Sequence, residues 1–213
     1  GDAAKITMIH HGVDEHFITS ASQKQIDLVK NKFNLQNKLV IGTVARYIPL
    51  KGYSALIEAT ANLVNHYTNI LFLGVGYGAQ LEELKEKIKE KKLEQHFILT
   101  DLLDYELMPA VYQCMDIYVH AAQIEPFGFV IAEAMFNKKS IITTRVGAAR
   151  DVLVHKESAF LINYDSPNEI AEGVKYIVDN QLGNEMADKS YELAKKHFAR
   201  EIMWQNYKNL FLQ

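Results

Sequence analysis

Along this chain, short continuously apolar runs alternate with longer amphipathic ones. Runs typical of buried strands cover 38–45, 69–73, 97–99, 116–120, 140–144 and 159–162. Apolar positions at helical spacing predict helices over 53–65, 80–92, 106–115, 128–137, 166–180, 185–197 and 200–212. Residues 1–36 do not fit this alternation and are interpreted as a connection entering the domain. The order predicts an α/β, Rossmann-like domain with a parallel sheet and helices on both faces.

The alternating order also predicts where function lies. In parallel sheets of this kind, ligands bind outside the carboxyl ends of the strands. The loops expected to carry the chemistry are therefore those after Ala45, Leu73, Leu99, His120 and Thr144.

The composition fits a globular domain and disfavours several classes. The 213 residues are 48% hydrophobic and 23% charged, which is enough for a sizeable core. The net charge of -3 argues against nucleic-acid binding, because such domains are usually clearly basic. No run approaches the ~20 apolar residues of a membrane span. Cys114 is the only cysteine, which fits a reducing compartment such as the cytoplasm. Gly1 in place of Met predicts an excised fragment or a cleaved tag.

Two cations, Arg46 and Lys51, flank a proline turn between the first strand and the next helix. Arg offers a planar fork of donors and Lys a point charge, so that together they suit a diphosphate. The adjacent helix N-terminus also favours an anion. Two ordinary solvated surface cations remain the alternative from this loop alone.

Two carboxylates, Glu125 and Glu133, bracket the helix that opens near Gly128. The N–H groups of Phe127, Gly128 and Phe129 are donors at a helix start, where no intrahelical partner exists. A carboxylate accepts from two vicinal hydroxyls, as on a ribose or hexose. Glu133 lies among apolar neighbours and needs a partner. The segment predicts a binding site, with an ordinary helix carrying a surface glutamate as the alternative.

Other suggestive features have simpler explanations. The glycines of 74–78 are at the wrong spacing for a dinucleotide fingerprint, so a flexible turn that ends the strand is the better interpretation. The pair at 10–11 is two histidines without further ligands at metal spacing, and no metal site is expected. The mixed acids and lysines of 82–92 indicate a solvated helix face. His120 either touches a ligand or is a hydrogen-bonded buried histidine.

The segment Glu125–Glu133 resembles the E-x7-E motif of the retaining GT-B glycosyltransferases of family 4, also called group 1. Its sequence EPFGFVIAEAM follows the usual E-G/P-F-G-hydrophobic-x-x-x-E-A-M almost completely. Resemblance to other short motifs of the family extends from about residue 6 to the C-terminus. Those motifs lie at 9–17, 42–52, 108–116, 146–152 and 165–171.

This resemblance implies the C-terminal half of a GT-B fold. Residues 1–18 would be the interdomain connecting segment, 19–197 the nucleotide-sugar (donor) binding domain, and 198–213 a C-terminal helix returning toward an N-terminal domain missing here. The enzyme would transfer a sugar, with retention, from a nucleotide-sugar to a glycan or lipid acceptor, as in polysaccharide biosynthesis. The fragment alone is expected to be inactive. A non-catalytic nucleotide-sugar-binding module is the alternative.

The family's roles transfer to single residues. Arg46 and Lys51 would hold the donor diphosphate and stabilise the leaving nucleoside diphosphate in place of a metal ion, so that no metal and no cofactor is expected. Glu125 would contact the donor sugar near its reacting face, and Glu133 the ribose hydroxyls. The N–H groups of 127–129 would reach the sugar or diphosphate.

The resemblance also implies the partners. The backbone at Leu103 would meet the nucleobase, which the sequence leaves open among uridine, guanosine and adenosine. The acceptor would bind the missing domain, with no nucleic acid and no transmembrane segment involved. A cytoplasmic location is expected, and peripheral attachment of the full-length protein to the cytoplasmic membrane face is left open.

Glycine spacing disfavours a nicotinamide enzyme, and the lack of a pyridoxal-binding lysine context disfavours a phosphorylase.

Overall fold

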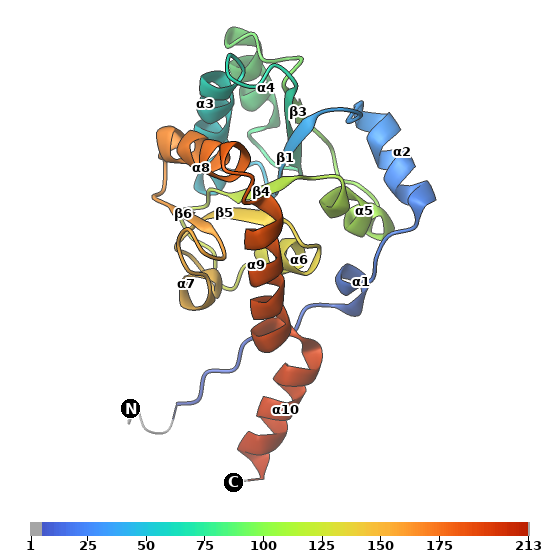
Figure 1. Cartoon of the computed structure of the whole chain (residues 1–213), viewed down its shortest axis with the longest axis vertical. Coiled ribbons are helices and arrows are strands. Elements are labelled where there is room, and N and C mark those ends of the chain that lie inside the picture. The colour runs from blue at the N-terminus through green and yellow to red at the C-terminus, as the bar shows by residue number, and fades with distance from the viewer. Residues whose placement is uncertain (1–5, 213) are drawn as a thin grey trace.

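Six parallel strands form one sheet in the computed structural model, which describes residues 6–212 (Figure 1). The strands are β1 (Leu39–Val44), β2 (Ile70–Val75), β3 (Phe97–Leu99), β4 (Ile117–His120), β5 (Ser140–Thr144) and β6 (Phe160–Ile162). Their spatial order is β3-β2-β1-β4-β5-β6, so β1 and β4 are neighbours although two strands separate them in sequence. The strand order reverses at this pair, which is where parallel sheets bind ligands.

Helices cover both faces of the sheet (Figure 1). Those on one side are α1 (Glu15–Ile18), α2 (Gln23–Phe33), α5 (Met108–Gln113), α6 (Phe129–Phe136), α7 (Ala149–Val152) and the end of α9 (Gly183–Phe198). Those on the other are α3 (Tyr53–Leu63), α4 (Leu81–Glu90) and α8 (Pro167–Asp179). Each face of the sheet has its own hydrophobic core. Consecutive residues of a strand point into different cores, as Val40 and Ile41 do. Burial on both faces explains why the strands are continuously apolar.

The predicted strands and helices are confirmed, with boundaries shifted by a few residues. One boundary was wrong, because β2 continues through Gly74 and Val75 instead of ending at the glycines. Gly74 pairs with Leu99 of β3, and a side chain there would collide with Leu99 and Tyr53. The glycine therefore serves close packing inside the sheet rather than a flexible turn.

The N-terminal part holds helices that the hydrophobic pattern did not reveal. Residues 23–33, expected as part of a connection, form α2, which buries Val29 and Phe33 against the sheet. Ser22 and Gln25 make a reciprocal capping box at its start, the sequence signal that would have found it. Ser166 occupies the N-cap of α8, but its side chain makes no capping bond.

Residues 9–14 lie against the junction of α9 and α10 (Arg200–Phe211). The Val13 N–H donates to the Phe198 carbonyl at 2.9 Å, and Arg200 pairs with Asp14 at 2.9 Å. From this junction α10 projects away from the sheet, and none of its residues is buried (Figure 1). Residues 1–5 of the predicted connecting segment and residue 213 of the predicted C-terminal helix lie outside the described residues. The domain boundaries stay predictions.

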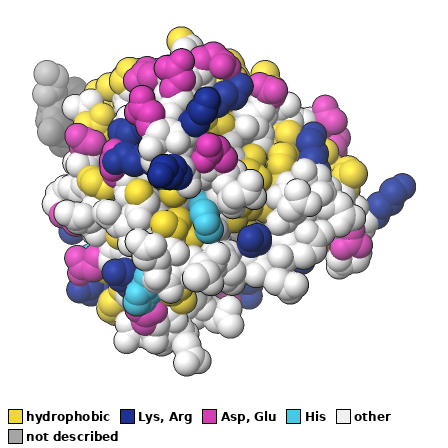
Figure 2. All heavy atoms as spheres, turned by 90° about the horizontal axis from the view of Figure 1, so that it is seen from above, with side chains coloured by type: hydrophobic (Ala, Val, Ile, Leu, Met, Phe, Trp, Pro, Cys, Tyr) yellow, Lys and Arg dark blue, Asp and Glu magenta, His cyan; other side chains and the backbone are white. Residues whose placement is uncertain are grey.

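The opposite end of the molecule carries α3 and α4, with acidic and basic side chains interspersed (Figure 2). Only Leu84 and Ile88 of α4 are buried, while Lys87 and Lys91 reach Glu58 at 3.2 and 2.6 Å. The solvated helix face predicted for residues 82–92 is confirmed. None of the helices between residues 6 and 212 is long and apolar enough to cross a bilayer.

Two glycines in left-handed conformation join the loops at the carboxyl edge. Gly52, at φ +71°, places its Cα against the Ala121 carbonyl, which connects the loops after β1 and β4. Gly147, at φ +55°, lies against the Phe127 carbonyl, which also accepts from the Ala148 N–H at 2.8 Å. The three loops form one contiguous surface because no Cβ separates them.

We therefore expect Gly147→Ala to be costly. Its methyl group would strike the Phe127 carbonyl in a backbone conformation that disfavours any Cβ. A loss of about 1–3 kcal/mol in the free energy of unfolding is expected in urea titrations. Gly183→Ala is the matched control, because a methyl group there meets only ordinary contacts. Equal stability of the two variants would contradict this account.

Candidate functional site

The side chains expected to bind the ligand lie at the carboxyl edge of β1 and β4. Arg46 follows β1, and Lys51 ends the 3-10 helix η2 (Pro49–Lys51). Glu125 lies in the loop after β4, and Glu133 lies within α6. The structure brings Lys51 into contact with Glu125, whereas Glu133 has a different partner.

Lys51 and Glu125 form an ion pair that is largely shielded from solvent. Lys51 Nζ donates to Glu125 Oε2 at 2.7 Å, and the two side chains are 12% and 17% exposed. His120 Nε2 lies 3.4 Å from the same oxygen. The nearby His120 and Lys51 lower the pKa of Glu125 to about 2, with His120 the larger cause. Glu125 is therefore a carboxylate at any neutral pH.

Glu133 is held by a tyrosine that the sequence analysis did not assign. Tyr112 of α5 donates its hydroxyl to Glu133 Oε2 at 2.6 Å. Burial raises the pKa of Glu133 to about 7, and the Tyr112 hydrogen bond only partly opposes this. The expected partner exists, and it comes from the 108–116 segment that resembles a family motif. Finding it required the packing of α5 on α6, which no sequence spacing shows.

A cavity of about 400 Å³ opens beside Arg46, between the ends of β1 and β2 and the loop after β3. Its lining is mostly apolar and includes Tyr77, Leu102, Leu103, Met108 and Val130. Leu103 and Arg46 therefore line the same cavity. Arg46 itself is exposed.

The start of α6 presents donors toward this edge. Gly128 is the N-cap, at φ +92°, and no side chain caps the helix. Within residues 6–212, no acceptor receives a hydrogen bond from the N–H groups of Phe127, Gly128 or Phe129. Such groups, together with the helix dipole, suit an anion or a hydroxyl.

The histidines of the N-terminal segment pack rather than form a ligand cluster. His10 lies against Phe198, and His11 lies edge-on to Phe127 with ring centroids 5.1 Å apart. In the described part of the chain, no group of three His, Cys, Asp or Glu side chains is arranged to hold a metal ion.

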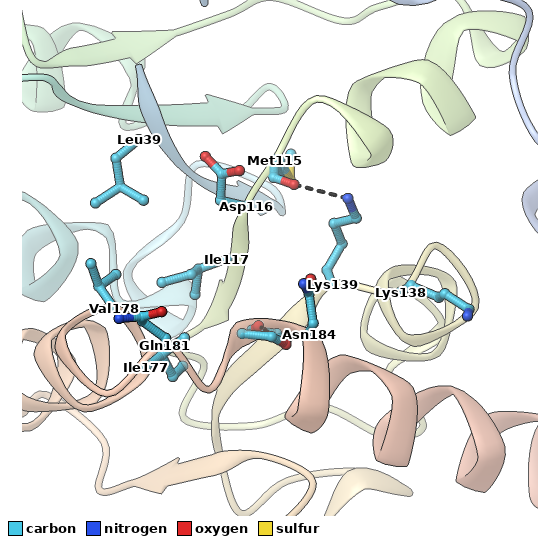
Figure 3. A pocket seen from close by; sticks show the side chains of 12 residues that line it. Leu39, Met115, Asp116, Ile117, Lys138, Lys139, Ile177, Val178, Gln181 and Asn184 are labelled. Carbon is cyan, nitrogen blue, oxygen red and sulfur yellow. Dashed lines mark hydrogen bonds between the residues drawn. The ribbon is translucent and has the colours of Figure 1, made fainter. Parts of the chain in front are cut away.

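A second cavity, of about 380 Å³, lies at the opposite, amino edge of β1, β4 and β5 (Figure 3). Lys139 donates there to the Met115 carbonyl at 3.0 Å, and Asp116 accepts from the Val40 N–H at 2.7 Å. Both charged side chains are therefore already bonded to backbone groups. None of the predicted site residues lines this cavity.

Comparison with known proteins identifies related sequences. The family described as Glycosyl transferases group 1 matches residues 25–197. An uncharacterised glycosyltransferase of Methanocaldococcus jannaschii is 27% identical, over 97% of this chain and 52% of its own length. The capsular polysaccharide biosynthesis glycosyltransferase CapM of Staphylococcus aureus is 26% identical, over 97% of this chain and 55% of its own. The chain spans about half the length of the curated relatives it matches.

Two solved structures share the fold. Anabaena HepE in complex with UDP and glucose superposes with a TM-score of 0.86 at 25% identity, over 99% of this chain and 58% of HepE. The C-terminal domain of the group 1 family protein LpcC from Francisella tularensis gives 0.78 at 27% identity, over 88% of this chain and 99% of that domain. The predicted fold class, a Rossmann-like sheet forming the C-terminal half of a GT-B fold, is confirmed.

The pKa of Glu133 predicts a pH-dependent stability. The folded protein keeps a proton near pH 6 that the unfolded chain, with an ordinary pKa of 4.5, has already lost. The resulting stabilisation is complete below pH 4.5 and is lost as the pH rises through about 7. The shift corresponds to about 3 kcal/mol.

Urea titrations between pH 5 and pH 8 test this linkage. Glu133→Gln carries no titrating proton at this position. Its free energy of unfolding should therefore increase relative to that of the unchanged protein as the pH rises. Glu201→Gln, on exposed α10, is the control and should follow the unchanged protein. Parallel curves for Glu133→Gln and the unchanged protein would show that Glu133 has no raised pKa.

Proposed function

This chain belongs to the group 1 glycosyl transferases, and we propose that it is the donor-binding domain of a retaining glycosyltransferase that uses a nucleotide-sugar. One observation carries the proposal. Cations, carboxylates and helix-start N–H groups lie at a single edge of the sheet, where Arg46 lines an apolar cavity. These are the chemical groups that a nucleoside diphosphate linked to a sugar requires.

The diphosphate is proposed to bind Arg46, Lys51 and the N–H groups of 127–129. Fixed positive charge and oriented donors stabilise the negative charge that develops on a departing nucleoside diphosphate. Before the diphosphate arrives, Glu125 keeps Lys51 at this edge of the sheet. We propose that these groups take the role of a metal ion, with no cofactor.

The nucleoside is proposed to occupy the cavity beside Arg46. Glu133 accepts from the two ribose hydroxyls, with Tyr112 keeping its carboxylate oriented. The apolar walls suit the face of a nucleobase, whose polar edge meets the backbone at Leu103. The likeness to HepE, solved with UDP and glucose, supports a uridine nucleotide. Glu125 contacts the sugar.

The whole enzyme is proposed to need a second domain for its acceptor, a glycan or lipid. The chain spans about half of its curated relatives, which include a capsular polysaccharide glycosyltransferase. Large apolar side chains stay exposed on and after α10, namely Ile202, Trp204, Tyr207, Leu210, Phe211 and Leu212. We propose that these side chains pack on that second domain and that the chain alone transfers little sugar. The enzyme is proposed to work in the cytoplasm, in keeping with the free thiol of Cys114.

A thermal-shift assay tests the donor site. For a Kd of about 0.1 mM, about 1 mM UDP-glucose stabilises a domain by roughly 1.4 kcal/mol. The melting temperature should then rise by about 3–6 °C. Arg46→Ala and Glu133→Ala should lose the shift, and Lys89→Ala, an exposed cation on α4, should keep it.

GDP- and ADP-glucose complete the assay. A shift with one of these alone would keep the donor site and replace the proposed uridine. Absence of a shift with all three, or a shift that survives in both site variants, would overturn the proposed function.

A further inference from the structure

Four side chains form a connected line from the sheet interior to the proposed donor site. Tyr118 Oη lies 3.4 Å from His120 Nδ1, and His120 Nε2 lies 3.4 Å from Glu125 Oε2, which Lys51 holds at 2.7 Å. Tyr118 and His120 occupy alternate positions of β4, so both side chains point to the same face of the sheet. The strand therefore sets their spacing.

The line fixes which nitrogen of His120 carries the proton. Burial raises the pKa of Tyr118, so its hydroxyl keeps its proton and can either donate to Nδ1 or accept from it. Burial also lowers the pKa of His120, which favours the neutral ring, and the Glu125 carboxylate near Nε2 can only accept, which favours the hydrogen on Nε2. The charged groups that face the ring are Glu125 and Lys51. The Nε2–H then lies near the Glu125 carboxylate, at an N···O distance of 3.4 Å, without an aligned hydrogen bond.

The contact of this N–H with Glu125 is long in the observed arrangement. His120 is 1% exposed, and in the described part of the chain Nε2 has no well-aligned hydrogen-bond partner. Lys51 holds the Glu125 oxygen that lies closest to it. A buried donor without a proper partner is costly, and so is a shielded carboxylate that loses its cation. Both costs disappear if Glu125 turns to His120 when Lys51 leaves.

We propose that His120 is a positioning residue that takes over the Glu125 carboxylate when the donor diphosphate recruits Lys51. The inference rests on the proposed function and deepens it, because it assigns a second state to the same site. Without His120, Glu125 depends on Lys51 alone and competes with the diphosphate for it. Loss of the His120 N–H should therefore weaken the binding of UDP, even though His120 does not touch the nucleotide.

Nitrogen-15 NMR of the histidines tests the geometry of the line without relying on activity. His120, assigned by its loss in His120→Gln, should be neutral with the proton on Nε2 at pH 8. Saturating UDP should shift its Nε2 proton downfield as the contact to Glu125 shortens. A charged ring or a proton on Nδ1 would overturn the inference.

A double-mutant cycle tests the function of the line. His120→Leu should weaken UDP binding by about fivefold in calorimetry, and the loss should fall below about twofold in a Glu125→Gln background. His120→Gln retains an N–H donor and should stay within about twofold of the unchanged protein. Equal losses in both backgrounds, or a Gln variant as weak as the Leu variant, would reduce His120 to a packing residue.

Two further results separate the possible failures. If His120→Leu does not fold, Tyr118→Phe replaces it in the test. Loss of the hydroxyl should mix the two His120 tautomers and weaken UDP binding. No change in the tautomers or in UDP binding would overturn the inference. If the unchanged chain does not bind UDP, the proposed uridine donor fails, while the tautomer measurement still decides whether His120 is directed at Glu125.

Discussion

The pairing of β1 with β4 is the interaction on which the site depends. Ile41 and Gly42 align with Ile117 and Tyr118, and this register brings together two loops that are far apart in sequence. A parallel sheet requires crossover connections, so both strands end at the same edge. Gly52 then packs the two loops backbone to backbone. This packing places Lys51 beside Glu125.

Different neighbours shift the pKa values of the two glutamates of this edge in opposite directions. Glu125 lies between a cation and a buried N–H, and its pKa falls to about 2. Glu133 lies among apolar side chains with a single hydroxyl donor, and its pKa rises to about 7. Environments that separate the pKa values of neighbouring acids are typical of functional sites. The fixed charge suits an electrostatic role, and the adjustable one suits a group that gains donors on binding.

Much of this arrangement could be predicted from the sequence, since strands buried on both faces are continuously apolar and a glutamate amid apolar helix residues demands a partner. What could not be predicted depends on three-dimensional packing. Gly74 lies inside β2, where Leu99 and Tyr53 leave no room for a side chain. The partner of Glu133, Tyr112, lies on another helix.

Calorimetry of UDP-glucose binding near pH 6.5, in two buffers with different ionisation enthalpies, tests the central claim most directly. Ribose hydroxyls that donate to Glu133 favour its charged form, so binding should lower its pKa and release a fraction of a proton. The account predicts a binding enthalpy that differs between the buffers for the unchanged protein and not for Glu133→Gln. Binding with the same enthalpy in both buffers, and unaffected by Glu133→Gln, would contradict a nucleotide site at this edge of the sheet.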